Sequence, residues 1–147
     1  MWGAAILSLV LGAAIMLTPP DYNASWRQDA LRAQGQAGSF VTYRTAATKF
    51  AAGSPGFVGV VPTASLALPG HFVNQGLWTA RMESGWVYVY GSPLAATVNG
   101  VLELMGDTEQ VGLKQSGTLF SPLYGNTGTA LPAWIPNGAI VSASPAN

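Results

Sequence analysis

The pattern of apolar and polar positions divides the chain into an apolar start, a helical stretch and a β-like remainder. Residues 1–18 are uncharged and almost all apolar, and Pro19 and Pro20 end this run. As a helix, the run would rise roughly 26 Å, close to the ~30 Å hydrocarbon core of a bilayer. We therefore predict a transmembrane anchor over residues 1–18. Its main membrane-contacting residues are expected to be Trp2, Ile6, Leu9, Val10, Leu11, Ile15 and Leu17.

A cleaved secretory signal is the alternative interpretation of this run. Such signals usually have a cationic start and small residues at a cleavage site. No Lys or Arg precedes Arg27, and the small pair Gly12 and Ala14 lies inside the apolar run, so an uncleaved anchor is favoured. Arg27 and Arg32 favour a cytoplasmic body by the positive-inside rule. The Gly/Ser/Thr/Asn-rich remainder is instead typical of a small exported bacterial domain, and we predict a periplasmic soluble domain on the inner membrane.

Residues 24–52 carry a stripe with alternating spacings of four and three, which predicts one long helix. The stripe consists of Trp26, Ala30, Ala33, Ala37, Phe40, Arg44, Ala47 and Ala51. Asn23 or Ser25 can serve as the N-cap, and the segment 53–56, with two glycines and a proline, can end the helix. Because most of the stripe is alanine, we expect packing on the chain's own domain rather than a self-associating coiled coil.

From Phe57 onward, short β-like runs alternate with Gly, Pro, Ser and Asn. Residues 57–61 predict a strand, and residues 64–68 predict a short strand or a turn. The clearest hairpin joins residues 77–82 and 86–90 through a three-residue loop, Glu83-Ser84-Gly85. In the second of these runs, aromatic residues at 86, 88 and 90 alternate with valines at 87 and 89. This strand is therefore apolar on both faces and is predicted to lie in the interior of the sheet.

The last part of the chain adds a helix and a second hairpin. Ser92-Pro93 reads as the start of a helix over residues 94–105 that Gly106 ends. Its inward residues are predicted to be Leu94, Val98, Val101, Leu102 and Met105. Residues 111–114 and 118–120 predict a hairpin around the turn 115–117. A loop over residues 121–129 and a closing strand over residues 139–141 are expected to follow.

Together these elements predict an α+β fold. It comprises an N-terminal membrane-anchoring helix, a second long helix, and a small, mostly antiparallel sheet with one packed helix. Residues 19–147 are expected to form a single soluble domain, with a helix over residues 24–52 and a sheet-rich body over residues 56–147.

Composition narrows the functions that such a domain can have. The chain has no cysteine, which excludes disulfides, a thiol nucleophile and thiolate metal ligands. Its six basic and six acidic residues are spread thinly, so no basic surface is available for nucleic acid. The acidic residues Glu103, Asp107 and Glu109 are interpreted as a solvated helix end. We expect no metal and no cofactor.

Candidate catalytic residues can be named, but none belongs to a motif. His71 is the only histidine, Ser65 or Ser92 could act as a nucleophile, and Glu83 or Asp107 could orient a base. The chain contains none of the GxSxG, HExxH, P-loop or GxGxxG patterns. His71 follows Pro69-Gly70 and is expected to lie in a turn or on a rim. The sequence therefore predicts a protein that is not an enzyme.

Four segments, in this order after the helices, carry a resemblance to a known family. They are ALPGHF (residues 67–72), GWVYVYG (85–91), ELMGDTEQVGLKQSGTLFSP (103–122) and LPAWIPNGAIV (131–141). The chain thereby resembles the PilM family of the type IVb thin-pilus operons on conjugative plasmids, which are small inner-membrane proteins. The resemblance implies a component of the pilus biogenesis machine or basal body, without enzymatic activity and without transferable catalytic residues.

The order of a helix followed by a sheet is also similar to type IV pilins, which implies a pilin-like body. A prepilin leader, however, has a basic segment, a Gly at the cut and a Glu five residues later. Here the fifth residue after Gly3 is Ser8, and no acidic residue precedes Asp21. We therefore expect no processing of the pilin type.

Two classes of function remain open at this point. The favoured one is an anchored interaction module that uses its sheet edges and an exposed, proline-rich tail around Trp134 to bind other pilus-assembly or secretion-system subunits. The alternative is a pilin-like fibre subunit, and an exported surface binding domain is a third possibility. The expected partners include the membrane but not nucleic acid, and self-association into a homo-oligomer is left open.

Overall fold

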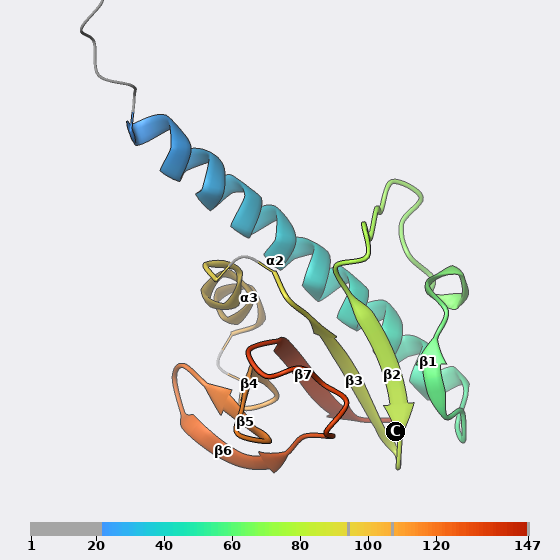
Figure 1. Ribbon diagram of the computed structural model, residues 1–147. Helices are drawn as coiled ribbons and strands as arrows, with labels where there is room; N and C mark the ends of the chain where they lie inside the picture. The colour runs from blue at the N-terminus through green and yellow to red at the C-terminus, as the bar shows by residue number, and fades with distance from the viewer. Residues whose placement is uncertain (1–21, 94, 107, 147) are drawn as a thin grey trace, which may run out of the picture. The chain divides into compact units, whose positions relative to one another are not determined.

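The fold is that of a computed structural model, which describes residues 22–93, 95–106 and 108–146 (Figure 1). The helices are α2 (Tyr22–Gly53), the short 3-10 helix η1 (Thr63–Ser65) and α3 (Thr97–Met105). The strands are β1 (Gly59–Val61), β2 (Thr79–Glu83), β3 (Trp86–Gly91), β4 (Val111–Gln115), β5 (Thr118–Ser121), β6 (Gly125–Ala130) and β7 (Ile140–Pro145). They form one sheet in the order β1-β2-β3-β7-β4-β5-β6. Every neighbouring pair is antiparallel, which confirms the predicted α+β class.

The predicted anchor over residues 1–18 lies outside the described residues. Among the residues that the structure does describe, none of the helices combines the length and apolarity of a membrane span. The chain divides into two units, residues 1–30 and residues 31–147, and the sheet belongs to the second. In the first unit, the described side chains of residues 24–30 are exposed, and the Arg27 guanidinium lies 5.8 Å from the centre of the Trp26 ring.

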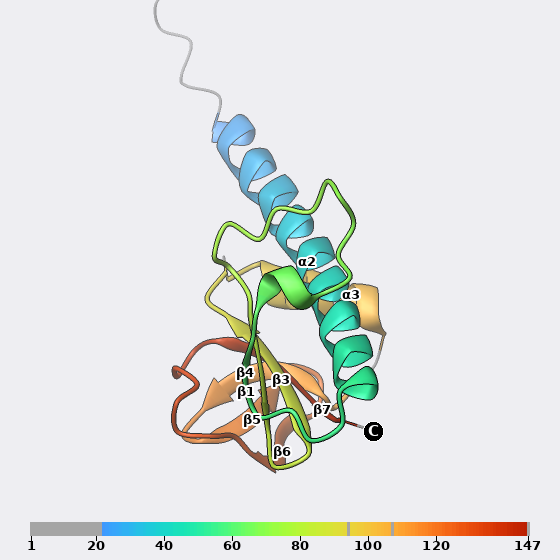
Figure 2. The same cartoon turned by 90° about the vertical axis from the view of Figure 1, so that its right-hand side faces the viewer.

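One face of the sheet packs against α3 and the part of α2 that begins at residue 31 (Figure 2). The predicted α2 stripe is confirmed from Ala33 to Ala51, where all its members are buried except the half-buried Arg44. The two helices approach closely at small residues. A Cβ added to Gly100 of α3 would lie only 3.1 Å from the Cβ of Ala37 in α2. The inward residues Val98, Val101 and Leu102 are buried as predicted, whereas Leu94 lies outside the described residues.

The opposite face of the sheet carries a second, smaller apolar cluster. It comprises Tyr88, Leu119, Leu131, Ile135, Ala139, Val141 and Ala143, with Tyr90 and Trp134 packed against it. Strand β3 separates the two clusters, because Val87 and Val89 face the helices while Tyr88 faces the second cluster. Since β3 pairs with β2 on one side and β7 on the other, its predicted interior position is confirmed.

Both predicted hairpins are present, but the predicted three-residue loops are wrong by one residue. Glu83 pairs with Trp86 and Gln115 pairs with Thr118, which leaves two-residue turns. Ser84 has φ 52° and Gly85 has φ 77°, and the equivalent residues of the second turn have φ 49° and 83°. Two successive positive φ values define a type I′ turn, whose twist matches that of the paired strands. The strand twist therefore favours the tighter connection.

Strand β6 was not predicted, because residues 121–129 are rich in Gly, Asn and Thr and were expected to form a loop. Backbone pairing forms this strand instead, since Asn126 pairs with Phe120 and Gly125 pairs with Ser121. The Thr127 hydroxyl also donates to the Leu119 carbonyl oxygen at 2.9 Å. The closing strand is likewise longer than predicted, because β7 extends from Ile140 to Pro145 between two partner strands.

The predicted helix starts are also corrected. Helix α3 begins at Thr97, and its N-cap residue is Ala96 rather than Ser92. The buried Thr97 hydroxyl donates to Gln36 Oε1 of α2 at 2.9 Å, so tertiary packing determines this start. Asn23 and Ser25, predicted as N-caps, lie within α2. The predicted ends of the two helices are confirmed at Gly53 and Gly106.

Candidate interaction surfaces

The residues that could be assigned catalytic roles do not converge. His71 is exposed in a turn between β1 and β2, as predicted, and Ser65 and Ser92 are exposed at the ends of other elements. Asp107 lies outside the described residues, and the Glu83 carboxylate is bound by side chains other than His71. Within the described ranges, no group of three or more His, Cys, Asp or Glu residues could hold a metal ion.

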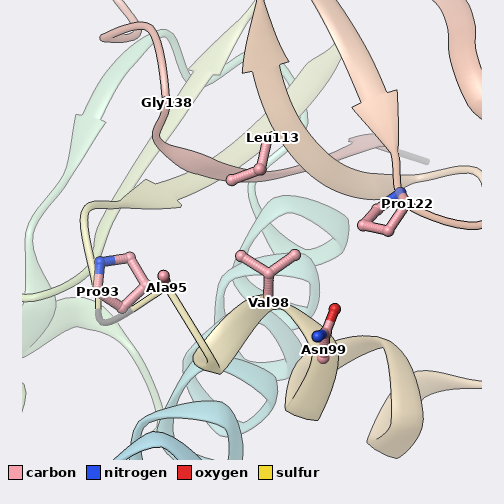
Figure 3. Close-up of a pocket in the computed structure, with 7 residues that line it drawn as sticks. All are labelled: Pro93, Ala95, Val98, Asn99, Leu113, Pro122 and Gly138. Carbon is pink, nitrogen blue, oxygen red and sulfur yellow. The ribbon is translucent and has the colours of Figure 1, made fainter.

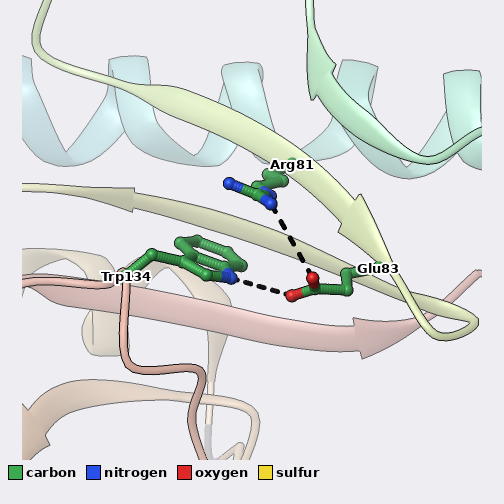
Figure 4. A network of polar contacts seen from close by, with 3 residues as sticks. All are labelled: Arg81, Glu83 and Trp134. Atoms are coloured by element: carbon green, nitrogen blue, oxygen red, sulfur yellow. Dashed lines mark hydrogen bonds and ion pairs between the residues drawn. The ribbon is translucent and has the colours of Figure 1, made fainter.

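A group of polar and aromatic side chains surrounds Trp134 on the sheet, and we call it the Trp134 cluster: Arg81, Glu83, Tyr88, Tyr90 and Trp134. Figure 4 shows the contacts among Arg81, Glu83 and Trp134. The Trp134 indole Nε1 donates to Glu83 Oε2 at 2.8 Å, and Arg81 Nη2 lies 3.7 Å from Glu83 Oε1. The Arg81 guanidinium also lies 4.5 Å from the centre of the Trp134 ring, within the range of a cation–π contact. Arg81 and Glu83 lie two residues apart on β2, which brings both side chains to the same face of the sheet.

Two tyrosines complete the packing of this indole. The centre of the Trp134 ring lies 5.6 Å from that of Tyr88, edge to face, and 5.4 Å from that of Tyr90. The sequence-based expectation of an exposed tail around Trp134 is therefore wrong, because the ring is half-buried against the sheet. The neighbouring Trp86, stacked on Tyr88 at 6.5 Å, is more accessible, with 37% of its surface exposed.

Burial and charge also act on Tyr88. Its phenol is buried in the second cluster, and this burial raises its pKa because the phenolate would lose hydration. The negative charge of Glu83 raises the pKa of Tyr88 further. Tyr88 is therefore held in its neutral form, suited to packing rather than to acid–base chemistry near pH 7.

Lys114 holds the segment that carries Trp134. This lysine is only 5% exposed, and its Nζ donates to the carbonyl oxygens of Pro132 at 2.8 Å and Ile135 at 2.7 Å. The backbone N–H of Lys114 donates to the Ala139 carbonyl oxygen, and the Lys114 carbonyl oxygen accepts from the Gly138 N–H, both at 2.9 Å. Sequence reasoning missed this role. The available signal was strand alternation, which places Lys114 on the face opposite Val111 and Leu113.

Arg44 links α2 to the middle strand of the sheet. Its Nε donates to Ser142 Oγ at 2.7 Å, and its Nη2 donates to Gln110 Oε1 at 3.0 Å. Burial lowers the pKa of Arg44, because the packed helix and sheet remove water from the guanidinium. This arginine belonged to the predicted stripe. Its guanidinium bonds Ser142 and Gln110, which gives a polar residue a role at this position of the stripe.

A groove runs between α3 and the strands β4 and β5, and we call it the α3 groove. One hollow of about 300 Å³ lies among Pro93, Val98, Leu113 and Pro122 (Figure 3). A second hollow, also about 300 Å³, lies farther along α3 and is lined by Leu102, Glu103 and Leu123. Asn99 and Pro122 line both hollows, so the two hollows are adjacent.

Comparison with known proteins places the chain in a family. A sequence profile of the PilM family matches residues 6–143. This chain belongs to the PilM family. The resemblance carried by the four sequence segments is thereby confirmed, and PilM membership points to a pilus-related role.

Two crystal structures of PilM proteins are similar to this chain. The one from Escherichia coli B7A is 22% identical, with a TM-score of 0.58 over 80% of this chain and 94% of that chain. The one from Pseudomonas aeruginosa 2192 is 30% identical, with a TM-score of 0.49 over 78% of this chain and 94% of that chain. The Escherichia coli protein shares the fold. A comparison with curated proteins gives no match.

Proposed function

We propose that this chain is a non-enzymatic, inner-membrane-anchored component of a type IV pilus biogenesis or basal-body machine. It acts through protein–protein contacts, with its soluble domain in the periplasm. The observation that carries the proposal is the match of the PilM family over residues 6–143. The uncharged, apolar run over residues 1–18 supports an anchor for the domain.

The contacts of three charged side chains, Arg44, Glu83 and Lys114, support a binding role over catalysis. Lys114 and Arg44 hold other parts of the fold in place, and Glu83 is engaged by Trp134 and Arg81. These contacts use the side chains that a catalytic site would need to keep free. The α3 groove and the exposed ring of Trp86 offer surface to a partner instead. A partner contact at Trp134 stays a prediction, limited to the part of its ring that the sheet leaves uncovered.

The test is a deletion of the gene in cells that make the pilus, followed by complementation, membrane fractionation and crosslinking in the intact envelope. We expect loss of pili, recovery with the full chain, and an intact Met1 in the inner membrane crosslinked to pilus-assembly subunits. Unchanged pilus assembly in the deletion strain would contradict the proposal. So would a chain with a trimmed N-terminus that is released from the membrane.

A pilin-like fibre subunit is the second candidate. It is favoured by the position of α2 before the sheet and by the exposed side chains of residues 24–32, which offer surface for helix packing in a fibre. Recovery of the chain in sheared surface filaments would support this candidate, whereas its retention in the membrane fraction would support the machine component.

A further inference from the structure

The α3 groove has the form of a binding site for a short segment of another protein. Val98 projects from α3 toward Leu113 of β4, and Asn99 projects toward Pro122 at the end of β5 (Figure 3). Two prolines, Pro93 and Pro122, help to form its walls. Because proline fixes its own backbone φ angle, these two residues lose little conformational entropy when a partner binds.

The lining specifies what the groove can accept. Val98, Leu102, Leu113 and Leu123 make both hollows mainly apolar, and 60% of the surface of Leu123 is exposed. The amide of Asn99, between the hollows, offers both a donor and an acceptor, which suits a backbone peptide group. The exposed Glu103 carboxylate lies in the second hollow, where it would attract a cation.

We propose that the α3 groove binds a segment of a partner subunit that presents two large apolar side chains and one Lys or Arg. This inference rests on the proposed function and names the chemistry of the partner. One apolar side chain occupies each hollow, the peptide between them bonds Asn99, and the basic residue pairs with Glu103. Such a segment matches the groove in apolar contact, hydrogen bonding and charge.

The charge of the groove favours a protein over a lipid surface. Proteins that bind anionic bilayers do so through Lys and Arg. Among the described residues that line the two hollows there is no Lys or Arg, and the one charged residue is the acidic Glu103. The described lining therefore offers no cation to an anionic bilayer, whereas its carboxylate attracts a basic peptide.

The test uses photo-crosslinking of the full chain in cells that make the pilus. A benzoylphenylalanine probe replaces Leu123 in the groove or, as a control, Val73, which is 67% exposed in the connection between β1 and β2. We expect the Leu123 probe to give an adduct with one pilus subunit. Mass spectrometry should map the adduct to a segment with two large apolar residues and a Lys or Arg.

Two pairs of variants at exposed positions probe the contacts. Asn99→Trp fills the groove between its hollows and is expected to lower the adduct at least tenfold, while Thr45→Trp on α2 leaves it unchanged. Glu103→Lys reverses the groove charge and is expected to lower the adduct about two- to fivefold, as for an exposed ion pair, whereas Glu109→Lys does not. All four substituted positions are exposed. Circular dichroism verifies that each variant is folded.

Several results would overturn this inference. They are an adduct with phospholipid, an adduct with a second copy of this chain, no adduct from Leu123, or an adduct that Asn99→Trp leaves unchanged. A wrong inference about the groove can be told apart from a wrong proposed function. If deletion of the chain abolishes pili but Asn99→Trp assembles them normally, the machine component stands and the groove does not bind the partner.

Discussion

At the scale of single residues, Lys114 shows how one buried cation can hold a segment that has little regular structure. The segment between Leu131 and Ala139 crosses the second face of the sheet, and two of its carbonyl oxygens accept from Lys114 Nζ. Hydrogen bonds to a charged donor are stronger than neutral ones. The position of Trp134 therefore depends on a lysine that lies on β4.

Replacing this lysine by methionine tests the dependence. Lys114→Met keeps an unbranched side chain but leaves the carbonyls of Pro132 and Ile135 without their donor. We expect the free energy of unfolding to fall by about 2 kcal/mol, as measured by chemical denaturation. Lys49→Met, at an exposed position of α2, is the control and should change it by less than about 0.5 kcal/mol. Equal free energies of unfolding for the two variants would show that the Lys114 contacts make no net contribution to stability.

The raised pKa of Tyr88 predicts that the stability of the fold depends on pH in the alkaline range. The folded chain raises the pKa of its phenol above the value near 10 expected in the unfolded chain. The folded state therefore binds this proton more tightly. The resulting stabilisation is fully present below about pH 10 and is lost as the pH rises through the folded-state pKa. In denaturation experiments, the chain should lose stability relative to Tyr88→Phe only in that alkaline range.

The neighbouring carboxylate supplies a second test of the same residue. Glu83→Gln removes the negative charge that contributes to the raised pKa of Tyr88. The alkaline loss of stability should then be smaller and be complete at a lower pH, because the folded-state pKa moves closer to the unfolded-state value. Glu109→Gln, at an exposed position, should leave the loss unchanged. An alkaline transition that is identical in both variants would contradict the role of Glu83.

At the scale of the elements, the two hairpins show how strand twist constrains the turns. Ser84 and Ser116 adopt positive φ values that serine disfavours and that Asn adopts more readily. We expect Ser84→Asn and Ser116→Asn each to raise the free energy of unfolding by about 0.5 kcal/mol. Ser65→Asn, at an exposed position in η1, should not. A decrease in either hairpin variant would contradict the type I′ assignment.

The end of β3 depends on a close approach that only glycine allows. A Cβ at Gly91 would overlap the Leu77 carbonyl oxygen and lie 2.6 Å from Cε3 of the buried Trp78. Trp78 cannot move away easily, because its indole Nε1 donates to Ser39 Oγ at 2.8 Å. We expect Gly91→Ala to lower the thermal midpoint through a loss of about 2 kcal/mol. Gly70→Ala, where an added Cβ meets nothing within 4 Å, is the control.

At the scale of the whole molecule, the proposed function includes an anchor over residues 1–18 that holds the chain in the inner membrane. An arginine placed in the middle of a membrane span costs roughly 2.5–3.5 kcal/mol in insertion. We therefore expect Leu9→Arg to lower the share of the chain in the membrane fraction and to reduce pilus assembly. Thr45→Arg, at an exposed position of α2, should do neither. Normal membrane recovery of Leu9→Arg would contradict the anchor.

Much of the fold was predictable because its residues carry a strong periodic pattern. The stripe from Ala33 to Ala51 predicted which side of α2 is buried, and the alternation in β3 predicted an interior strand with two apolar faces. Strand β6 has no such pattern and exists through its pairing with β5. Trp134 was expected to be exposed, whereas its ring is half-buried, because the residues that cover it are distant in the chain. Its role at an interface stays a prediction.

The sequence by itself determined the helix that packs on the sheet, the interior strand, the absence of cysteine chemistry and the membership of the PilM family. These follow from local periodicity, composition and the order of segments. The tertiary structure decided the type of the turns, the burial of Lys114 and the Trp134 cluster, and it formed the α3 groove. Each of these depends on contacts between residues far apart in sequence, where strand pairing and packing outweigh local preference.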